Sequence, residues 1–323
     1  MRKGLFEDSP PFTQFIMLFF TMVTCYLLFT FTGMLLASLI LGIPFIELMN
    51  SSSGVNALQN LNLMRYVQVL QHIGLFIIPA FFAAYLFSGN ATGYLRLRKI
   101  RTLNGDALNK VKPAIWFGAV LLLMLAAIPF INLLAALNEM IVFPESMSGL
   151  EQRLRFAEET AQQIIKLFLN VDHAGGMLFN IFMMAILPAL GEELIFRGVI
   201  QKIFIRWTGN IHVGIIITGL LFSLFHFQFY GFFPRWLLGI MFGYLMVWSG
   251  TIWLPVFAHF VNNVVAVFLS YLIHQGTISE TIEEIGANQT DIPVTIAATA
   301  ICAWLLWKIY RSRMNYDLSF TLK

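Results

Sequence analysis

Apolar residues fill eight segments of the chain, and shorter polar segments separate them. Most of these segments are long enough to cross a membrane as a helix, although the sixth is short and the fourth carries charged residues. The first is about twice as long as the apolar part of a signal peptide, and no small-residue cleavage site follows it, so we expect it to remain as a span. The pattern predicts an all-α, polytopic helix bundle with about eight transmembrane helices, at 14–40, 67–87, 114–137, 177–202, 213–229, 236–248, 254–274 and 294–309.

The composition agrees with a membrane protein. Hydrophobic residues make up 58% of the 323 residues, charged residues only 11%, and the mean hydropathy is +0.76. A soluble domain would need a larger polar surface. The formal net charge of +3 is too small to indicate a nucleic-acid partner, and the two cysteines, each within an apolar segment, give no disulfide framework. We therefore expect a multi-pass protein of the plasma (cell inner) membrane whose partners are the lipid bilayer and a membrane-associated substrate.

The positively charged residues are unevenly distributed between the two sides of the predicted bundle. Lys and Arg concentrate before the first span, between the second and third, after the fourth and after the last. Because such residues favour the cytoplasmic side, this distribution predicts an N-in, C-in protein with an even number of spans.

One polar segment, at about 145–170, has a helical pattern. Its apolar residues recur every three or four positions, and Ser148 and Glu151 have the spacing of a capping box. We predict an amphipathic helix that lies on the outer membrane face or over the bundle. Two roles stay open for it: a packing cover, or a part in substrate access.

Few ionisable residues lie inside the predicted spans. Glu192, Glu193 and Arg197 are in the fourth, His226 in the fifth and His259 in the seventh. A charged group at the centre of a membrane helix costs about 2.5 to 3.5 kcal/mol on insertion scales. Such a group needs a partner or a water-filled cavity, so this cluster is the candidate functional site. His72, near the outer end of the second span, is interpreted as interfacial, and the remaining histidines, His173, His212 and His274, lie at span ends, so no chemistry is assigned to them.

Helix geometry assigns different tasks to the two glutamates. Glu193 and Arg197 are four residues apart and can form an ion pair on one face, whereas Glu192 is rotated from Glu193 by about 100°. We interpret the pair as structural and Glu192 as the chemical group. Pro188 leaves the Met184 carbonyl without its helical donor, which predicts a kink, and Gly191 lets another backbone or a substrate come close.

The other two spans add imidazoles and a carboxamide. In "FSLFHF", Phe222 lies one turn before His226, so that an aromatic ring packs beside the imidazole, and in "AHFVNN" His259 and Asn263 share a helix face. A carboxylate and an imidazole that converge on one water form a general base, and a second imidazole with a carboxamide can donate hydrogen bonds to an oxyanion. These are the groups needed for amide hydrolysis. The sequence has no G-x-S-x-G motif, no pair of membrane Asp residues and no H-E-x-x-H motif. It therefore lacks the catalytic residues of serine, aspartyl and zincin peptidases.

The same residues carry a resemblance to a known family. "EELIFR" matches E-E-x-x-x-R, "FSLFH" matches F-x-x-x-H and "HFVNN" matches H-x-x-x-N, the motifs of the CAAX-protease and bacteriocin-processing (CPBP, or Abi) intramembrane proteases. The resemblance covers about 177–274. By similarity to the Ras-converting CAAX endopeptidases of this family, Glu192 and His226 would activate the water, and His259 and Asn263 would line the oxyanion side. Glu193 and Arg197 would fill the remaining motif positions.

The resemblance implies a division of the chain. We predict one membrane domain over 1–323, in which 1–170 hold the N-terminal spans and the outer helix, 177–274 the catalytic core, and 294–323 the last span and a cytoplasmic tail. Counted from the inner span ends, His259 lies shallower and His226 deeper than Glu192. Two arrangements would reconcile these depths: strongly tilted helices, or a fourth helix that ends soon after Arg197.

Two choices about function stay open at this stage. The sequence favours an intramembrane endopeptidase, and the alternative is a non-proteolytic immunity or scaffold protein of the same fold. Glu192, His226 and His259 could supply three zinc ligands. A metal-free mechanism is favoured, since Asn263 is a poor zinc ligand and a good hydrogen-bond donor.

Overall fold

The computed structural model describes residues 3–51, 61–97 and 113–312. These residues form helices and turns, and no strand occurs among them. The α-helices are α1 (Pro11–Leu41), α2 (Phe45–Ser51), α3 (Leu61–His72), α4 (Ile78–Ser88), α5 (Ala91–Tyr94), α6 (Pro113–Glu139), α7 (Ser148–Leu169), α8 (Ala174–Asn180), α9 (Leu187–Ile195), α10 (Gln201–Thr208), α11 (Ile211–Leu224), α12 (Phe232–Ser249), α13 (Trp253–His274) and α14 (Ile292–Arg311). The protein is an all-α polytopic membrane protein, as the apolar pattern predicts.

Three π-helical turns join some of these helices into longer rods. Ile73–Ile77 connects α3 to α4, Ile181–Ile186 connects α8 to α9, and Phe196–Ile200 connects α9 to α10. The rod from α8 to α10 spans 35 residues. At about 1.5 Å per residue it is roughly 50 Å long, well beyond the hydrocarbon core of about 30 Å, so it must tilt or extend beyond the core. The suggestion that the fourth helix ends soon after Arg197 is therefore wrong.

The number of full-length spans differs from the prediction. Six helices of the described chain are long and apolar enough to cross a membrane. The two remaining predicted segments, 213–229 and 236–248, correspond to α11, with 14 residues, and α12, with 18 residues. Neither meets the same combination of length and apolarity, because α11 is short and the first two turns of α12 contain a proline, an arginine and a tryptophan.

The fifth predicted segment ends earlier than its apolar residues suggest. We expected helix up to residue 229, but α11 ends at Leu224 and a turn follows it. Phe227 in this turn has φ +53°, in the left-handed region that a non-glycine residue seldom adopts. His226 therefore lies in the turn that connects α11 to α12 rather than inside a helix.

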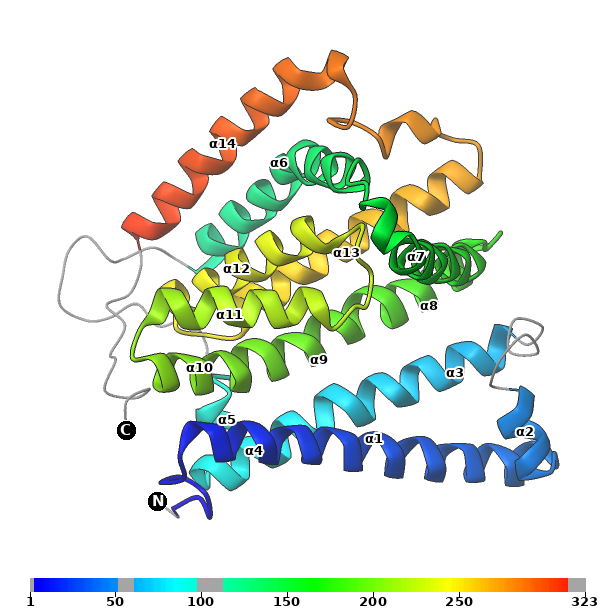
Figure 1. Ribbon diagram of the computed structural model, residues 1–323, viewed down its shortest axis with the longest axis vertical. Coiled ribbons are helices and arrows are strands. Elements are labelled where there is room, and N and C mark those ends of the chain that lie inside the picture. The colour runs from blue at the N-terminus through cyan, green and yellow to red at the C-terminus, as the bar shows by residue number, and fades with distance from the viewer. Residues whose placement is uncertain (1–2, 52–60, 98–112, 313–323) are drawn as a thin grey trace.

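The helices are arranged in layers, as Figure 1 shows. The rod from α3 to α4 packs with α1 on one side, the rod from α8 to α10 lies next, and α11, α12 and α13 follow. On the far side α6 and α14 pack together. One apolar core joins α1 and α4 to the region around Phe196, and a second fills the space between α6, α12, α13 and α14. The middle rod therefore lies between the two layers and carries the E-E-x-x-x-R motif at its centre.

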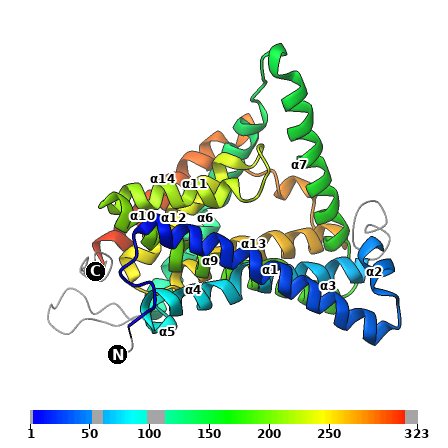
Figure 2. The ribbon, with the colours of Figure 1, turned by 60° about the horizontal axis from the view of Figure 1, so that its bottom comes forward.

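The polar segment after α6 forms the predicted amphipathic helix. Figure 2 shows α7 standing away from the main bundle, with one end near α3 and α13. The predicted capping box is wrong: Ser148 is the first helical residue, no side chain caps the N-terminus, and Glu151 instead accepts a hydrogen bond from the Phe143 N–H at 3.3 Å. Arg155 also donates to Glu151, and this hydrogen bond lowers the pKa of the Glu151 carboxyl.

The predicted orientation and domain division stay predictions. Much of the inner positive charge belongs to 98–112 and 313–323, which lie outside the described residues. Among the basic residues that are described, Lys202 donates to the Tyr94 carbonyl and Arg206 to the Ser9 carbonyl. These contacts join the end of the middle rod to the start of α1 and to α5, so the helix ends that we predict to be cytoplasmic lie together.

Candidate active site

Glu193 and Arg197 form a fully buried ion pair. Both side chains are 0% exposed, and an Arg197 Nη1 donates to Glu193 Oε1 at 2.8 Å. This confirms the pair predicted from their four-residue spacing. The same Glu193 oxygen also lies 2.9 Å from Nδ1 of His259 on α13. Glu193 thus balances the charge of Arg197 and also connects it to His259. The spacing of residues in the sequence does not predict the contact between Glu193 and His259.

A backbone carbonyl and aromatic rings around Arg197 offset the cost of removing its guanidinium from water. Its second terminal nitrogen donates to the Gly239 carbonyl of α12 at 3.1 Å, and its guanidinium lies 4.5 Å from the ring centroid of Phe222. Gly239 also lets α12 pack closely against α11, because a Cβ there would lie 2.9 Å from the Gly219 Cα. Hydrogen bonds and aromatic faces replace the water that a buried guanidinium loses.

His259 is held as tightly as its carboxylate partner. The imidazole is stacked on Phe242, with ring centroids 5.2 Å apart and an interplanar angle of 19°, and Phe222 meets it edge-on at 5.8 Å. With Nδ1 facing an anionic carboxylate, this nitrogen carries the proton, and Nε2 points away from the pair. The orientation of His259 is therefore fixed by Glu193 on one side and by two aromatic rings on the others.

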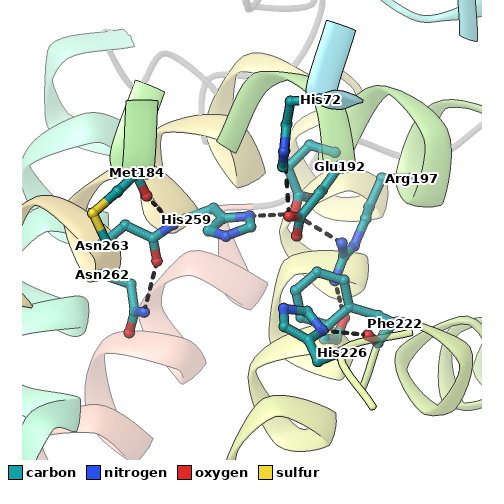
Figure 3. A network of polar contacts seen from close by, with 11 residues as sticks. His72, Met184, Glu192, Arg197, Phe222, His226, His259, Asn262 and Asn263 are labelled. Carbon is teal, nitrogen blue, oxygen red and sulfur yellow. Dashed lines mark hydrogen bonds and ion pairs between the residues drawn. The ribbon is translucent and has the colours of Figure 1, made fainter. Parts of the chain in front are cut away.

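Glu192 lies on a different side of the same helix, as the rotation of about 100° predicts. Its side chain is buried, and Oε2 has no hydrogen-bond partner among the described residues. The carboxylate interacts electrostatically with the imidazoles of His226, His259 and His72. Figure 3 shows it between His72 and the group formed by Arg197, Phe222 and His226. Glu192 is therefore a buried carboxylate with one oxygen left for a small polar molecule.

His72 corrects the interpretation made from the sequence. We read it as interfacial, but it is 9% exposed and its Nε2 lies 3.5 Å from Glu192 Oε1. Its ring packs against Phe76 with centroids 4.8 Å apart. The sequence feature that could have indicated this contact is Gly191, the small residue next to Glu192. A glycine predicts that another element comes close but does not identify that element. The helix that carries His72 begins at Leu61, earlier than its apolar run, so the ring lies a full helix of 12 residues from that start.

His226 is held by the end of its own helix. Its Nδ1 lies 2.9 Å from the Phe222 carbonyl, and the two rings meet at 5.1 Å in a T-shaped contact, which confirms the predicted aromatic neighbour. A carbonyl can only accept, so Nδ1 is the donor, and Nε2 of the neutral ring is the acceptor. The early end of α11 thus frees a carbonyl that sets the tautomer of His226.

Asn263 makes a contact that the proline on the middle rod creates. Its Nδ2 donates to the Met184 carbonyl at 3.2 Å, which is the carbonyl that Pro188 deprives of its helical donor. Asn262 donates to the Asn263 side-chain oxygen at 3.1 Å. Asn263 and His259 share a face of α13, as predicted, but their nearest partners differ (Figure 3). One N–H of the Asn263 carboxamide stays available for a further acceptor.

The comparisons with known proteins agree with this geometry. Residues 174–265 match the family model described as "Type II CAAX prenyl endopeptidase Rce1-like". This part of the chain is Rce1-like. The match runs from α8 into α13, so it includes all three polar motifs and confirms the resemblance predicted from them. His72 and α7 lie outside the matched residues.

One curated relative supports the same part of the chain. The "Uncharacterized protein YpbD" of Bacillus subtilis (strain 168) is 31% identical over 93 residues, which is 27% of this chain and 43% of the relative. The chain thus covers less than half of the length of this relative. No solved structure matches.

The three candidate zinc ligands, Glu192, His226 and His259, all lie in the Rce1-like segment. Among the described ranges, no group of three or more His, Cys, Asp and Glu side chains is arranged to hold a metal ion. Of the three zinc ligands considered from the sequence, His259 directs Nδ1 at Glu193, and His226 directs Nδ1 at the Phe222 carbonyl. Because a zinc-binding imidazole commonly donates its other ring N–H to a carboxylate or a carbonyl, both contacts leave Nε2 free, and zinc at Glu192, His226 and His259 stays an alternative.

An apolar pocket of about 320 Å³ lies next to the Rce1-like site. Residues of α1, among them Phe15 and Met22, form one wall, and Leu221 of α11 forms another. Phe196 and Phe225, which also line it, directly precede Arg197 and His226 in sequence. The Phe196 ring also meets Phe222 at 5.3 Å between centroids, and Phe222 packs on Arg197, so the pocket adjoins the polar cluster through these rings.

Polar contacts connect α7 to the turn that carries His226. Gln228 donates to Glu158 of α7 at 3.0 Å, and Arg235 donates to the side-chain oxygen of Gln228 at 2.9 Å. Arg155 of α7 lies 4.6 Å from the ring centroid of Tyr230. The outer helix thus contacts the turn after α11, which is compatible with either of the two roles considered for it.

Proposed function

We propose that this protein is an intramembrane endopeptidase that hydrolyses a peptide bond with a water activated by Glu192 and His226. The observation that carries the proposal is the contrast between the two buried glutamates. Oε2 of both glutamates lacks a hydrogen-bond partner among the described residues, but the Oε1 atoms differ. Glu193 Oε1 is held by Arg197 and His259, whereas Glu192 Oε1 has only the 3.5 Å contact with His72, and its carboxylate interacts with imidazoles on three other elements. The Rce1-like match over 174–265 supports the same assignment.

In the proposed reaction, water attacks the scissile carbonyl carbon while Glu192 takes one of its protons. Nε2 of His226, the acceptor nitrogen of that ring, holds the other water hydrogen. The C–O bond forms, and the carbonyl oxygen becomes an oxyanion. The C–N bond then breaks, and the proton on Glu192 passes to the leaving amine, so that Glu192 ends as the carboxylate that began the cycle.

His259 and Asn263 are the proposed donors to the oxyanion. Nδ1 of His259 faces Glu193, so that Nε2 points away from this carboxylate and is the nitrogen that can donate to the oxyanion when it carries a proton. Asn263 uses one N–H on the Met184 carbonyl and has a second for the oxyanion. Donors already fixed in place need no reorganisation when the charge develops.

The proposed substrate is a membrane-associated peptide or protein. A pocket lined by aromatic and aliphatic side chains adjoins the site and suits an apolar side chain or a lipid chain next to the cleaved bond. Neither the pocket nor the donors distinguish a prenylated substrate from an unmodified one. We place the reaction in the plasma (cell inner) membrane.

The test is a comparison of membrane-protein fragments between cells that carry the wild type and cells that carry Glu192→Gln. We expect a set of fragments that occurs with the wild type and is missing with the variant, and these fragments identify the substrates. Identical fragment sets at equal protein abundance would contradict the endopeptidase and support the non-proteolytic immunity or scaffold protein.

The metal-free mechanism is tested on purified active protein. We expect elemental analysis to find less than one zinc per chain, and we expect turnover to survive exhaustive chelation, because Glu192 can activate water without a metal. Zinc at one atom per chain, with activity lost on its removal and regained on its return, would establish the zinc alternative at Glu192, His226 and His259.

A further inference from the structure

Glu192 lacks the restraints that hold its neighbour. Glu193 Oε1 has an Arg197 nitrogen at 2.8 Å and a His259 nitrogen at 2.9 Å. The nearest ionisable contact of Glu192 Oε1 is Nε2 of His72 at 3.5 Å, and Oε2 has no hydrogen-bond partner among the described residues. The last torsion of a glutamate side chain is broad, so a carboxylate without a hydrogen bond turns easily. A general base acts efficiently only when it is held in position.

The fold brings His72 to this carboxylate through a glycine. A Cβ at Gly191 would lie 2.9 Å from the Phe76 Cβ and 3.3 Å from a side-chain carbon of Ile77. Glycine is therefore the residue that lets the rod of α3 and α4 lie against α9. His72 is the last residue of α3, and the π-helical turn Ile73–Ile77 follows it directly. π-helical turns occur frequently at functional sites because they displace a side chain from the regular helical position.

His72 is a buried polar residue, and Glu192 is the group nearest to its Nε2 that could pair with it. The ring is 9% exposed and packs against Phe76, and its Nε2 has no hydrogen-bond partner among the residues the structure describes. A buried polar atom costs free energy unless it is paired. Shortening the contact with Glu192 by roughly 0.6 Å would give a charge-assisted hydrogen bond, and such bonds often tighten only when substrate is bound.

We propose that His72 is a positioning residue for the general base: its Nε2–H donates to Glu192 Oε1 and directs Oε2 at the reacting water. The assignment rests on the proposed function and adds to it an element, α3, that lies outside the Rce1-like match. His226 and His259 interact with the same carboxylate from the turn after α11 and from α13, and Arg197 and Arg235 also interact with it electrostatically. Of these groups, His72 lies at ion-pair distance from Glu192, with 3.5 Å between Nε2 and Oε1.

The test uses two substitutions with purified protein and a peptide that spans a cleavage site from the fragment comparison. His72→Phe keeps a ring against Phe76 but removes the donor, and we expect kcat to fall about 10- to 100-fold with KM unchanged, because the carboxylate acts in the transition state. His72→Gln keeps an N–H at nearly the same reach, and we expect it to restore kcat to within about threefold of the wild type.

A matched control is available on the same chain. His274 also faces a carboxylate, with its Nε2 2.8 Å from Asp172, but this pair lies at the end of α13, away from the site. We expect His274→Phe to leave kcat unchanged. In a Glu192→Gln background His72→Phe should cause no further loss, since residues that act as a unit are not additive.

The outcomes separate this proposal from the one on which it rests. If the wild type is active and Glu192→Gln is not, wild-type kcat in His72→Phe overturns the role of His72 alone. Equal losses of kcat and of thermal stability in His72→Phe and His72→Gln would also overturn it, because they indicate a packing role. Equal turnover of the wild type and Glu192→Gln would overturn the proposed function, and the positioning role with it.

Discussion

Replacing Glu192 by Gln is expected to abolish peptide hydrolysis and to leave the fold intact. The substitution removes the proton acceptor but keeps the size of the side chain, and loss of a general base typically costs about 10²- to 10⁴-fold in rate, or roughly 3 to 5 kcal/mol of transition-state stabilisation. The free energy of unfolding should change little, because Glu192 has no tight hydrogen bond to lose and a neutral amide is easier to bury than a carboxylate.

The measurement pairs turnover of a peptide substrate with thermal unfolding of the same protein in detergent micelles. Substrate binding to the inactive variant provides the control, and we expect it to match the wild type. Residual turnover within tenfold of the wild type would show that another group activates the water. A large fall in the unfolding temperature would show that Glu192 is primarily structural.

Replacing Glu193 by Gln is expected to have the larger effect on stability. Arg197 is 0% exposed and its ion pair is with Glu193, so the variant leaves a buried charge without its counter-charge. Breaking one partner of a buried ion pair costs about 3 to 5 kcal/mol, a large share of the roughly 5 to 15 kcal/mol that stabilises a typical protein. We expect lower yield and a lower unfolding temperature, together with loss of activity.

A double variant separates the two tasks of Glu193. Adding Arg197→Met removes the stranded charge and fills its space with an apolar chain, so part of the lost stability should return. Activity should stay absent, because His259 no longer faces a carboxylate that fixes its ring. Wild-type stability in Glu193→Gln would contradict the structural role, and wild-type activity in the double variant would contradict the orienting role.

The sequence by itself determined which residues of a single helix can contact one another. The spacing of Glu193 and Arg197, the aromatic neighbour of His226 and the carbonyl released by Pro188 all follow from the pitch of a helix, and the structure bears each of them out. The three motifs also predicted the Rce1-like resemblance of 174–265. The apolar pattern placed six of the eight predicted spans, since burial in lipid selects long apolar runs.

Tertiary structure decided which elements meet and where helices end. The contact of His259 with Glu193, and that of His72 with Glu192, join residues far apart in the sequence, and helical periodicity holds no information about such pairs. α11 ends at Leu224 because the chain then turns, although the residues of this turn are mostly apolar and look helical in sequence. Gly191 indicated a close approach, but only the packing of α3 against α9 showed that the approaching residue is His72, because a glycine permits contact without specifying its partner.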